Sequence, residues 1–267
     1  MSTTSSAMTI ATPTTLPAPR ALPSPGAIFM SLLKADLTTQ WRNRRASVMV
    51  ILVPIIIAMS WKPMIARSGG AFVLANAITF GLTALGLMGY SNSIARDREK
   101  DIFQRLRVTP APSWTIMCSR LSVQLVMIVL MTLIVMIVGF QYDHITLPVS
   151  GYIVGLLAAI CGGAVYLALG QAIVGLVRNP ETVSATSRLI FIGLVMVGTL
   201  SETHALGDFM YKADKYTPYG TLTTIVAGGL TPANWNSNTT VALLLTLGYT
   251  VAFAFFGIRW FKWSTKS

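Results

Sequence analysis

Residues 71–94, AFVLANAITFGLTALGLMGYSNSI, contain no charged side chain, and one residue later the stretch RDREKDIFQRLRVTP (96–110) has eight charged residues out of fifteen. Over the whole chain, 53% of the residues are hydrophobic and only 11% are charged. An apolar run of about 20 residues is long enough to cross a bilayer as an α-helix. The two stretches together therefore predict a membrane-spanning helix that ends in a compact charged loop.

Apolar runs of similar length recur along the chain, which predicts an all-α integral membrane protein with six transmembrane helices. The predicted spans cover residues 46–66, 71–94, 120–140, 149–177, 182–200 and 239–258. The fifth span contains Arg188, which could snorkel to the membrane surface or bind a lipid head group or an acidic partner. Residues 218–230 are apolar but too short to cross, so we predict a re-entrant or interfacial segment before the last helix.

The region before the first span divides into a tail and an amphipathic helix. Residues 1–26 are rich in Ser, Thr, Pro and Ala, and we predict a disordered cytoplasmic tail there, followed by a single domain over residues 27–267. Within residues 27–45, apolar side chains recur at intervals of four, with Arg42 among the charged residues beside them. The stripe consists of Phe29, Leu33, Leu37 and Trp41. This pattern predicts a helix that lies in the plane of the membrane interface.

The basic residues indicate how the chain is oriented. With six spans, both termini and the loops after the second and fourth spans share one side, which holds 16 of the 20 Lys and Arg residues. Cytoplasmic loops carry the excess of Lys and Arg, so we expect both termini in the cytoplasm. The net charge of +11 is then mainly a signal of topology, and it gives no reason to expect a nucleic-acid partner.

The sequence lacks the motifs of an enzyme. Neither His144 nor His204 has a second histidine or cysteine nearby at metal-ligand spacing, so we expect no metal site and no catalytic residues. The chain also has no Gly-x-x-x-x-Gly-Lys-Ser/Thr loop, so it cannot bind ATP through a P-loop. If its work requires ATP, a separate subunit must hydrolyse it.

Polar residues form a stripe on one face of the second predicted span. The stripe consists of Asn76, Thr79, Thr83 and Tyr90. Such groups in hydrocarbon face either protein or a water-filled cavity. They are therefore candidates for a substrate pathway, together with Arg188, and the alternative is hydrogen bonding between helices.

The charged stretch itself has the pattern of a docking element. Ile102, Phe103 and Leu106 fall on one side of a short helix, Arg105 and Arg107 lie off that side, and Pro110 ends it. An apolar knob with charged surroundings suits contact with a folded partner. The alternative is a solvated loop that only sets the topology.

The stretch RDREKDIFQRLRVTPAP (96–112) resembles the corresponding loop in permeases of ATP-binding-cassette (ABC) type-2 exporters, including the drug-resistance export type. The matching residues are Asp97, Arg98, Glu99, Leu106, Thr109 and Pro110, whereas Asp101 replaces the usual glycine. The amphipathic N-terminal helix, the six spans and the segment YTPYGTLTTIVAGGLTP (216–232) are similar to that family as well.

The resemblance implies a half-transporter in the inner (plasma) membrane of a bacterial cell. Two permease chains, identical or different, would each dock on a cytoplasmic ABC ATPase subunit that binds ATP and Mg. Residues 99–110 would form the cytoplasmic coupling helix, and an amphipathic cargo, such as a drug or a lipid, would leave past the second and fifth spans. An ion-driven carrier or channel, or an integral membrane enzyme acting on lipid, would be the alternatives.

Overall fold

The computed structural model describes residues 24–42, 44–100, 102, 113–202 and 207–260, and among those residues it consists of helices joined by short loops, with no strand. Five helices are long and apolar enough to cross a membrane, and a bent pair of shorter helices makes a sixth. The all-helical, multi-pass prediction is therefore confirmed. The predicted disordered tail at 1–26 lies almost wholly outside the described residues.

The first span is broken near its end. Helix α2 (Arg44–Ser60) stops at Trp61, and the chain continues through η1 (Lys62–Met64) and α3 (Ile65–Ser68) at an angle of 48° to the helix before them. Pro63 follows Lys62 in the short helix η1, and a proline cannot continue the α-helical hydrogen bonding of α2. The Lys62 ammonium donates to the carbonyl of Tyr142 at 2.9 Å, so this end of the span is held to the end of another helix.

The second span is a continuous helix from Gly70 to Glu99, six residues longer than the apolar run predicts. It consists of α4 (Gly70–Ala84), a π-helical turn η2 (Leu85–Tyr90) and α5 (Ser91–Glu99). No proline or glycine occurs between Gly89 and Pro110 to stop it, so the helix extends into the charged stretch. The first part of that stretch is thus the end of a membrane helix.

The π-helical turn lies where the second span touches helix α8 (Val149–Leu176). A methyl group added at Gly86 would come within 2.4 Å of Cβ of Tyr166, and one added at Gly170 within 2.5 Å of the Gly86 carbonyl oxygen. Glycine at both positions lets the two backbones meet.

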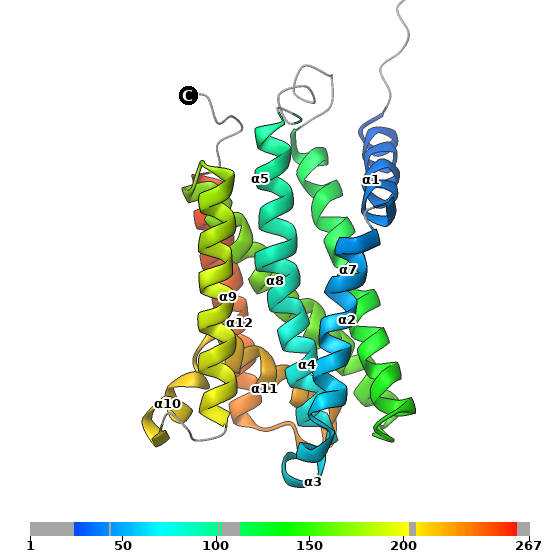
Figure 1. Ribbon diagram of the computed structural model, residues 1–267, viewed down its shortest axis with the longest axis vertical. Helices are drawn as coiled ribbons and strands as arrows, with labels where there is room; N and C mark the ends of the chain where they lie inside the picture. Colours follow the sequence, from blue (N-terminus) through cyan, green and yellow to red (C-terminus); the bar gives the residue numbers. More distant parts are fainter. Residues whose placement is uncertain (1–23, 43, 101, 103–112, 203–206, 261–267) are drawn as a thin grey trace, which may run out of the picture.

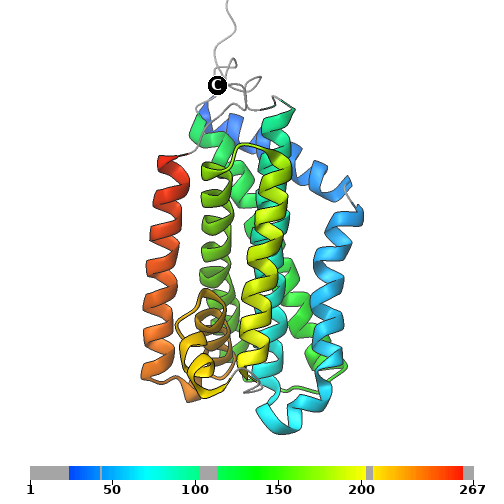
Figure 2. The same ribbon diagram turned by 60° about the vertical axis from the view of Figure 1, so that its left-hand side comes forward.

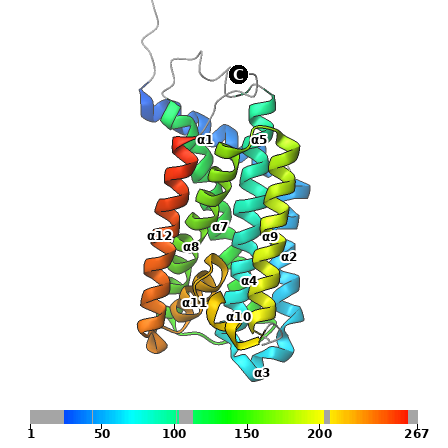
Figure 3. The same cartoon turned by 90° about the vertical axis from the view of Figure 1, so that its left-hand side faces the viewer.

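Helix α8 has neighbours on several sides. It packs against α7 (Ser113–Gln141) and against α12 (Ser237–Arg259), and α9 (Pro180–Glu202) follows it in the chain (Figures 1 and 3). The predicted fourth, fifth and sixth spans correspond to α8, α9 and α12, with ends that differ by no more than two residues.

Helix α11 (Pro218–Leu230) has the bounds of the short apolar segment and packs against α8, α4 and α12. Its last residue, Leu230, lies against Gly151 near the start of α8, whereas Leu222 lies against Gly162, halfway along α8. Helix α11 therefore starts deep in the bundle and runs back out. The preceding helix α10 (Gly207–Asp214) lies at the outside of the bundle (Figure 3).

The bundle has two chemically distinct ends, which we call the α1 end and the α10 end. Helix α1 (Pro25–Arg42) lies across the α1 end, where it packs mainly against α7 (Figure 2). Helices α3 and α10 and the short η3 (Pro232–Asn234) lie at the α10 end (Figure 1).

Candidate functional site

The residues predicted to contact a partner begin at the last turn of α5, at the α1 end. Asp97, Arg98 and Glu99 close that helix, and Ile102 is half-buried in helical backbone. The remaining predicted coupling residues lie outside the described part of the chain. They are Phe103, Arg105, Leu106, Arg107, Thr109 and Pro110.

Arg98 points into the bundle, with 1% of its surface exposed. Its guanidinium donates to the carbonyl oxygens of Val174 at 2.9 Å, Val177 at 2.8 Å and Arg178 at 2.9 Å. These carbonyls lie at the end of α8, where the helix leaves acceptors without internal partners and carries partial negative charge. Arg98 therefore ties the end of the second span to the end of the fourth, and its side chain offers no surface to an external partner.

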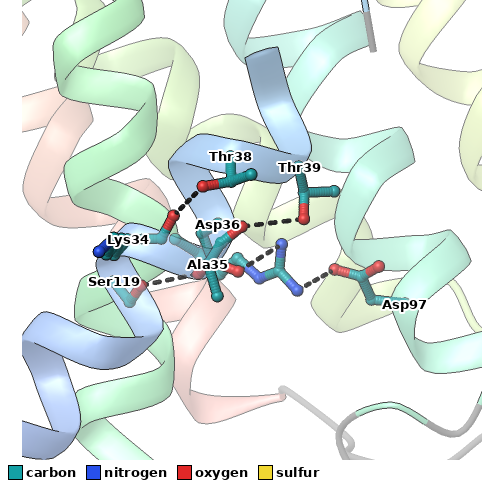
Figure 4. A network of polar contacts seen from close by, with 8 residues as sticks. Lys34, Ala35, Asp36, Thr38, Thr39, Asp97 and Ser119 are labelled. Atoms are coloured by element: carbon teal, nitrogen blue, oxygen red, sulfur yellow. Dashed lines mark hydrogen bonds and ion pairs between the residues drawn. The ribbon is translucent and has the colours of Figure 1, made fainter. Parts of the chain in front are cut away.

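Arg120 joins helices α1, α5 and α7 at the same end through its ion pairs with Asp36 and Asp97. Figure 4 shows Asp36, Asp97 and Ser119 within this network. The Arg120 guanidinium lies 2.8 Å from the carboxylate of Asp97 on α5 and 3.3 Å from that of Asp36 on α1. Asp36 also accepts a hydrogen bond of 2.7 Å from the hydroxyl of Ser119, the neighbour of Arg120 on α7. Less than a fifth of each charged side chain is exposed, so water screens the pairs less than it screens pairs on an open surface.

The apolar stripe predicted for α1 does not include Asp36, so the sequence pattern did not predict this cluster. Within the predicted stripe, Phe29, Leu33 and Leu37 are half-buried, whereas Trp41 is 75% exposed, and Arg42 is exposed as well. Each step of four residues turns a helix about 40° too far, so three steps carry Trp41 about 120° from Phe29. Helix α1 packs against α7, and its half-buried residues also include Leu32, Asp36 and Gln40, of which Asp36 contacts Arg120 and Ser119 of α7.

The polar stripe of the second span is buried inside the chain, with at most 1% of each residue exposed. Thr83 donates to the carbonyl of Thr79 at 2.7 Å, and Asn76 donates to the carbonyl of Phe72 at 3.2 Å. The hydroxyl oxygen of Thr223 on α11 lies 3.3 Å from that of Thr79. Tyr90 donates to the side-chain oxygen of Gln171 on α8 at 2.7 Å. Hydrogen bonding within and between helices thus accounts for much of this stripe in the conformation described.

Arg188 stands apart from that stripe, exposed on α9. Its neighbour Ser187 is fully buried and lies 2.8 Å from the hydroxyl of Ser91 on α5, which fixes the rotation of α9. Leu189 is 71% exposed and Met196 54% exposed, so α9 leaves an apolar face uncovered. The candidate pathway residues therefore do not form one lining within a single chain.

Among the described residues, no group of three or more His, Cys, Asp or Glu side chains could hold a metal ion. The charged groups at the α1 end are arranged to hold helices together. A displacement of α5 would therefore be transmitted to α8 through Arg98. It would also be transmitted to α1 and α7 through Arg120.

In a comparison with known protein families, the family model described as ABC-2 type transporter matches residues 28–219. This range begins in α1 and ends at the second residue of α11, so it covers the first five spans and the charged stretch. No curated protein matches the chain.

Proposed function

The chain belongs to the ABC-2 type transporter family, and from this premise we propose that it is the permease subunit of an ATP-driven exporter. The family is a transport membrane subunit and not itself a catalytic enzyme, and the bundle is that of a multi-pass membrane protein. Family membership carries the proposal. The cargo would be an amphipathic molecule, such as a drug or a lipid, moved out of the cytoplasm or the inner leaflet, and export of antibiotics or several drugs is one form of this activity.

A separate ABC ATPase subunit would supply the energy. The sequence contains no P-loop, so ATP and Mg would be bound by that partner. Two permease chains, identical or different, would assemble with two ATPase subunits. The uncovered apolar face of α9 supports a second permease chain there, because an exposed apolar face in a membrane packs against either lipid or protein.

Coupling would run through the charged stretch after α5. Phe103 and Leu106 would seat an apolar knob in the ATPase, and Asp97, Arg98 and Glu99 would connect that knob to the bundle. The contacts of Arg98 with α8, and of Arg120 with Asp97 and Asp36, support this role because they leave α5 little freedom to move alone. Helix α1, lying across the bundle, would be the interfacial helix on the same side.

The α1 end would face the cytoplasm of a bacterial cell, with both termini there. The excess of Lys and Arg on that side supports this orientation. Helix α11 would be a re-entrant segment that enters from outside, supported by its contact with Gly162 at half the length of α8. The stripe of Asn76, Thr79, Thr83 and Tyr90 would meet cargo only in a conformation that separates α4 from α8 and α11.

The test is reconstitution with an ATPase subunit encoded in the neighbouring genes. We expect the permease alone to hydrolyse no ATP, and the complex to hydrolyse ATP and to export cargo from proteoliposomes. Phe103→Asp and Leu106→Asp should abolish transport while the protein still inserts. Phe209→Asp is the matched control, because Phe209 is 80% exposed on α10 at the opposite end. Normal transport by both variants would contradict the coupling role.

A further inference from the structure

A polar cavity opens at the α10 end of the bundle, away from the charged cluster at the α1 end. Its volume is about 710 Å³, and its walls come from the start of α4, the loop at 145–147, the end of α10, helix α11 and the start of α12. Cavities of roughly 300–1,000 Å³ are the size that holds small organic ligands. No assigned or predicted role uses this cavity.

One face of α11 explains why the space is hollow. Six residues at helical spacing face the cavity, and all are small or hydroxylated. They are Gly220, Thr223, Thr224, Ala227, Gly228 and Thr231. The opposite face carries Leu222, Ile225, Val226 and Leu230, all fully buried in the core. Helix α11 therefore fills the core on one side and leaves room on the other.

The hydroxyl groups of this wall present hydrogen-bond acceptors to the cavity. Thr224 donates its proton to the carbonyl of Gly220 at 2.7 Å, and Thr231 donates to that of Ala227 at 2.9 Å. Thr223 donates to the carbonyl of Tyr219, and Thr239 donates to the side-chain oxygen of Asn236. Because a hydroxyl has one proton and two lone pairs, these oxygens retain only acceptor capacity.

The charged groups of the cavity favour a cation. Two carboxylates, Asp214 and Glu202, line it, against one ammonium, Lys215. Asp214 is 4% exposed and accepts a hydrogen bond of 2.8 Å from Thr217. Burial raises the pKa of its carboxyl group, and an ammonium group beside it would stabilise the charged form. The Lys215 ammonium lies 4.7 Å from the ring centre of Tyr211, which already stabilises it as a cation.

From this geometry we infer that the cavity binds the protonated amine of a small hydroxylated molecule, with the amine at Asp214 and the hydroxyl groups along the threonine face of α11. A primary ammonium has three donors and no acceptor, which complements a wall of acceptors and carboxylates. The exposed side chains of Asn234, Asn236 and Asn238 at the cavity edge offer both donors and acceptors to the hydroxyl groups. The inference concerns binding alone and does not depend on ATP-driven export.

The experiment measures binding to the full-length chain in phosphatidylcholine nanodiscs, without any ATPase. The probes are glucosamine, which carries an amine, and glucose and N-acetylglucosamine, which do not carry one. Titration calorimetry or saturation-transfer NMR gives the affinities. We expect glucosamine to bind about tenfold more tightly than either neutral sugar, as one added hydrogen bond to a buried charge implies.

Two variants test the site and one serves as its control. Asp214→Asn keeps the acceptor for Thr217 and should remove the preference for glucosamine, and Thr224→Val should weaken glucosamine binding severalfold. Asp208→Asn removes a carboxylate from an exposed position on the same helix, outside the cavity wall, and should leave affinity unchanged. Equal binding of the three sugars to the unaltered chain, no binding of glucosamine at its solubility limit, or an unchanged preference in Asp214→Asn would each overturn the inference.

Discussion

The second and fifth spans were both expected to border a substrate pathway, yet they are packed in opposite ways. In the second span, 72% of the most apolar window is buried within the chain, whereas in α9 only 17% is buried. The second span contacts α2, α7, α8, α9 and α11, so it is enclosed by its own chain. Helix α9 packs on one side only and exposes Leu189 and Met196 on the other.

The difference separates two mechanical roles. An enclosed helix whose polar groups are bonded to its neighbours cannot move without moving them, because buried groups left unpaired are costly. A helix with a free apolar face can exchange lipid for protein at little cost, because lipid tails are as apolar as leucine. The second span is thus built to transmit displacement, and α9 is built to present a surface.

Among substitutions that test this difference between the two spans, Arg98→Gln is expected to have the largest effect on stability. The change removes the charged donor from three carbonyls at the end of α8, and we expect a loss of about 3 kcal/mol in the free energy of unfolding. Arg96→Gln, on an exposed position of the same helix, should cost less than about 0.5 kcal/mol. Thermal unfolding in detergent measures both. Equal losses would show that α8 does not depend on Arg98.

A smaller effect is expected from Gly86→Ala at the π-helical turn. The new methyl group would press on the backbone and Cβ of Tyr166, which cannot rotate away, so we expect a loss of about 2 kcal/mol. Gly89→Ala is the matched control three residues along, where the nearest heavy atom would lie at 3.9 Å. It should change stability by no more than about 1 kcal/mol. If Gly86→Ala and Gly89→Ala lower the free energy of unfolding equally, the second span is not packed as tightly against α8 as described.

The smallest effect is expected from Arg188→Gln on α9, a change of less than about 0.5 kcal/mol in stability, because the residue is exposed. Its neighbour Ser187 faces inward onto Ser91, and Ser187→Ala should cost about 1 kcal/mol. The same unfolding measurement compares the two. If Arg188→Gln lowers the free energy of unfolding more than Ser187→Ala does, then the exposed face of α9 is in fact packed against other residues of the chain.

Local sequence patterns predicted the helices well and their partners poorly. Residues 149–177 were predicted to span, and α8 covers Val149–Leu176, because a run of that length without charge has few other stable states in a bilayer. The same patterns grouped Arg98 with the coupling residues and did not indicate that its side chain is buried in the bundle. No local pattern could indicate this burial, since Arg98 finds its acceptors 76 to 80 residues away in the chain.

The polar cavity is a second example of a feature that local sequence patterns indicate only in part. The stretch PYGTLTTIVAGGL (218–230) indicates the small and hydroxylated face of α11. At helical spacing, these residues fall on a different face from the leucines and the isoleucine. Whether that face packs or stays open depends on α4, α10 and α12, which arrive from elsewhere in the chain.

Taken by itself, the sequence determined that this protein is a helical membrane protein, where its spans lie and which loop resembles that of an ABC type-2 permease. Hydropathy and helical period are local properties, and they suffice for that. The tertiary structure decided which charged side chains form contacts inside the bundle, where the second span meets α8 and where a cavity remains. Those outcomes depend on hydrogen bonds and packing contacts between residues that are far apart in the chain. The polar groups must pair with one another because the hydrocarbon of a membrane contains no water to pair with them.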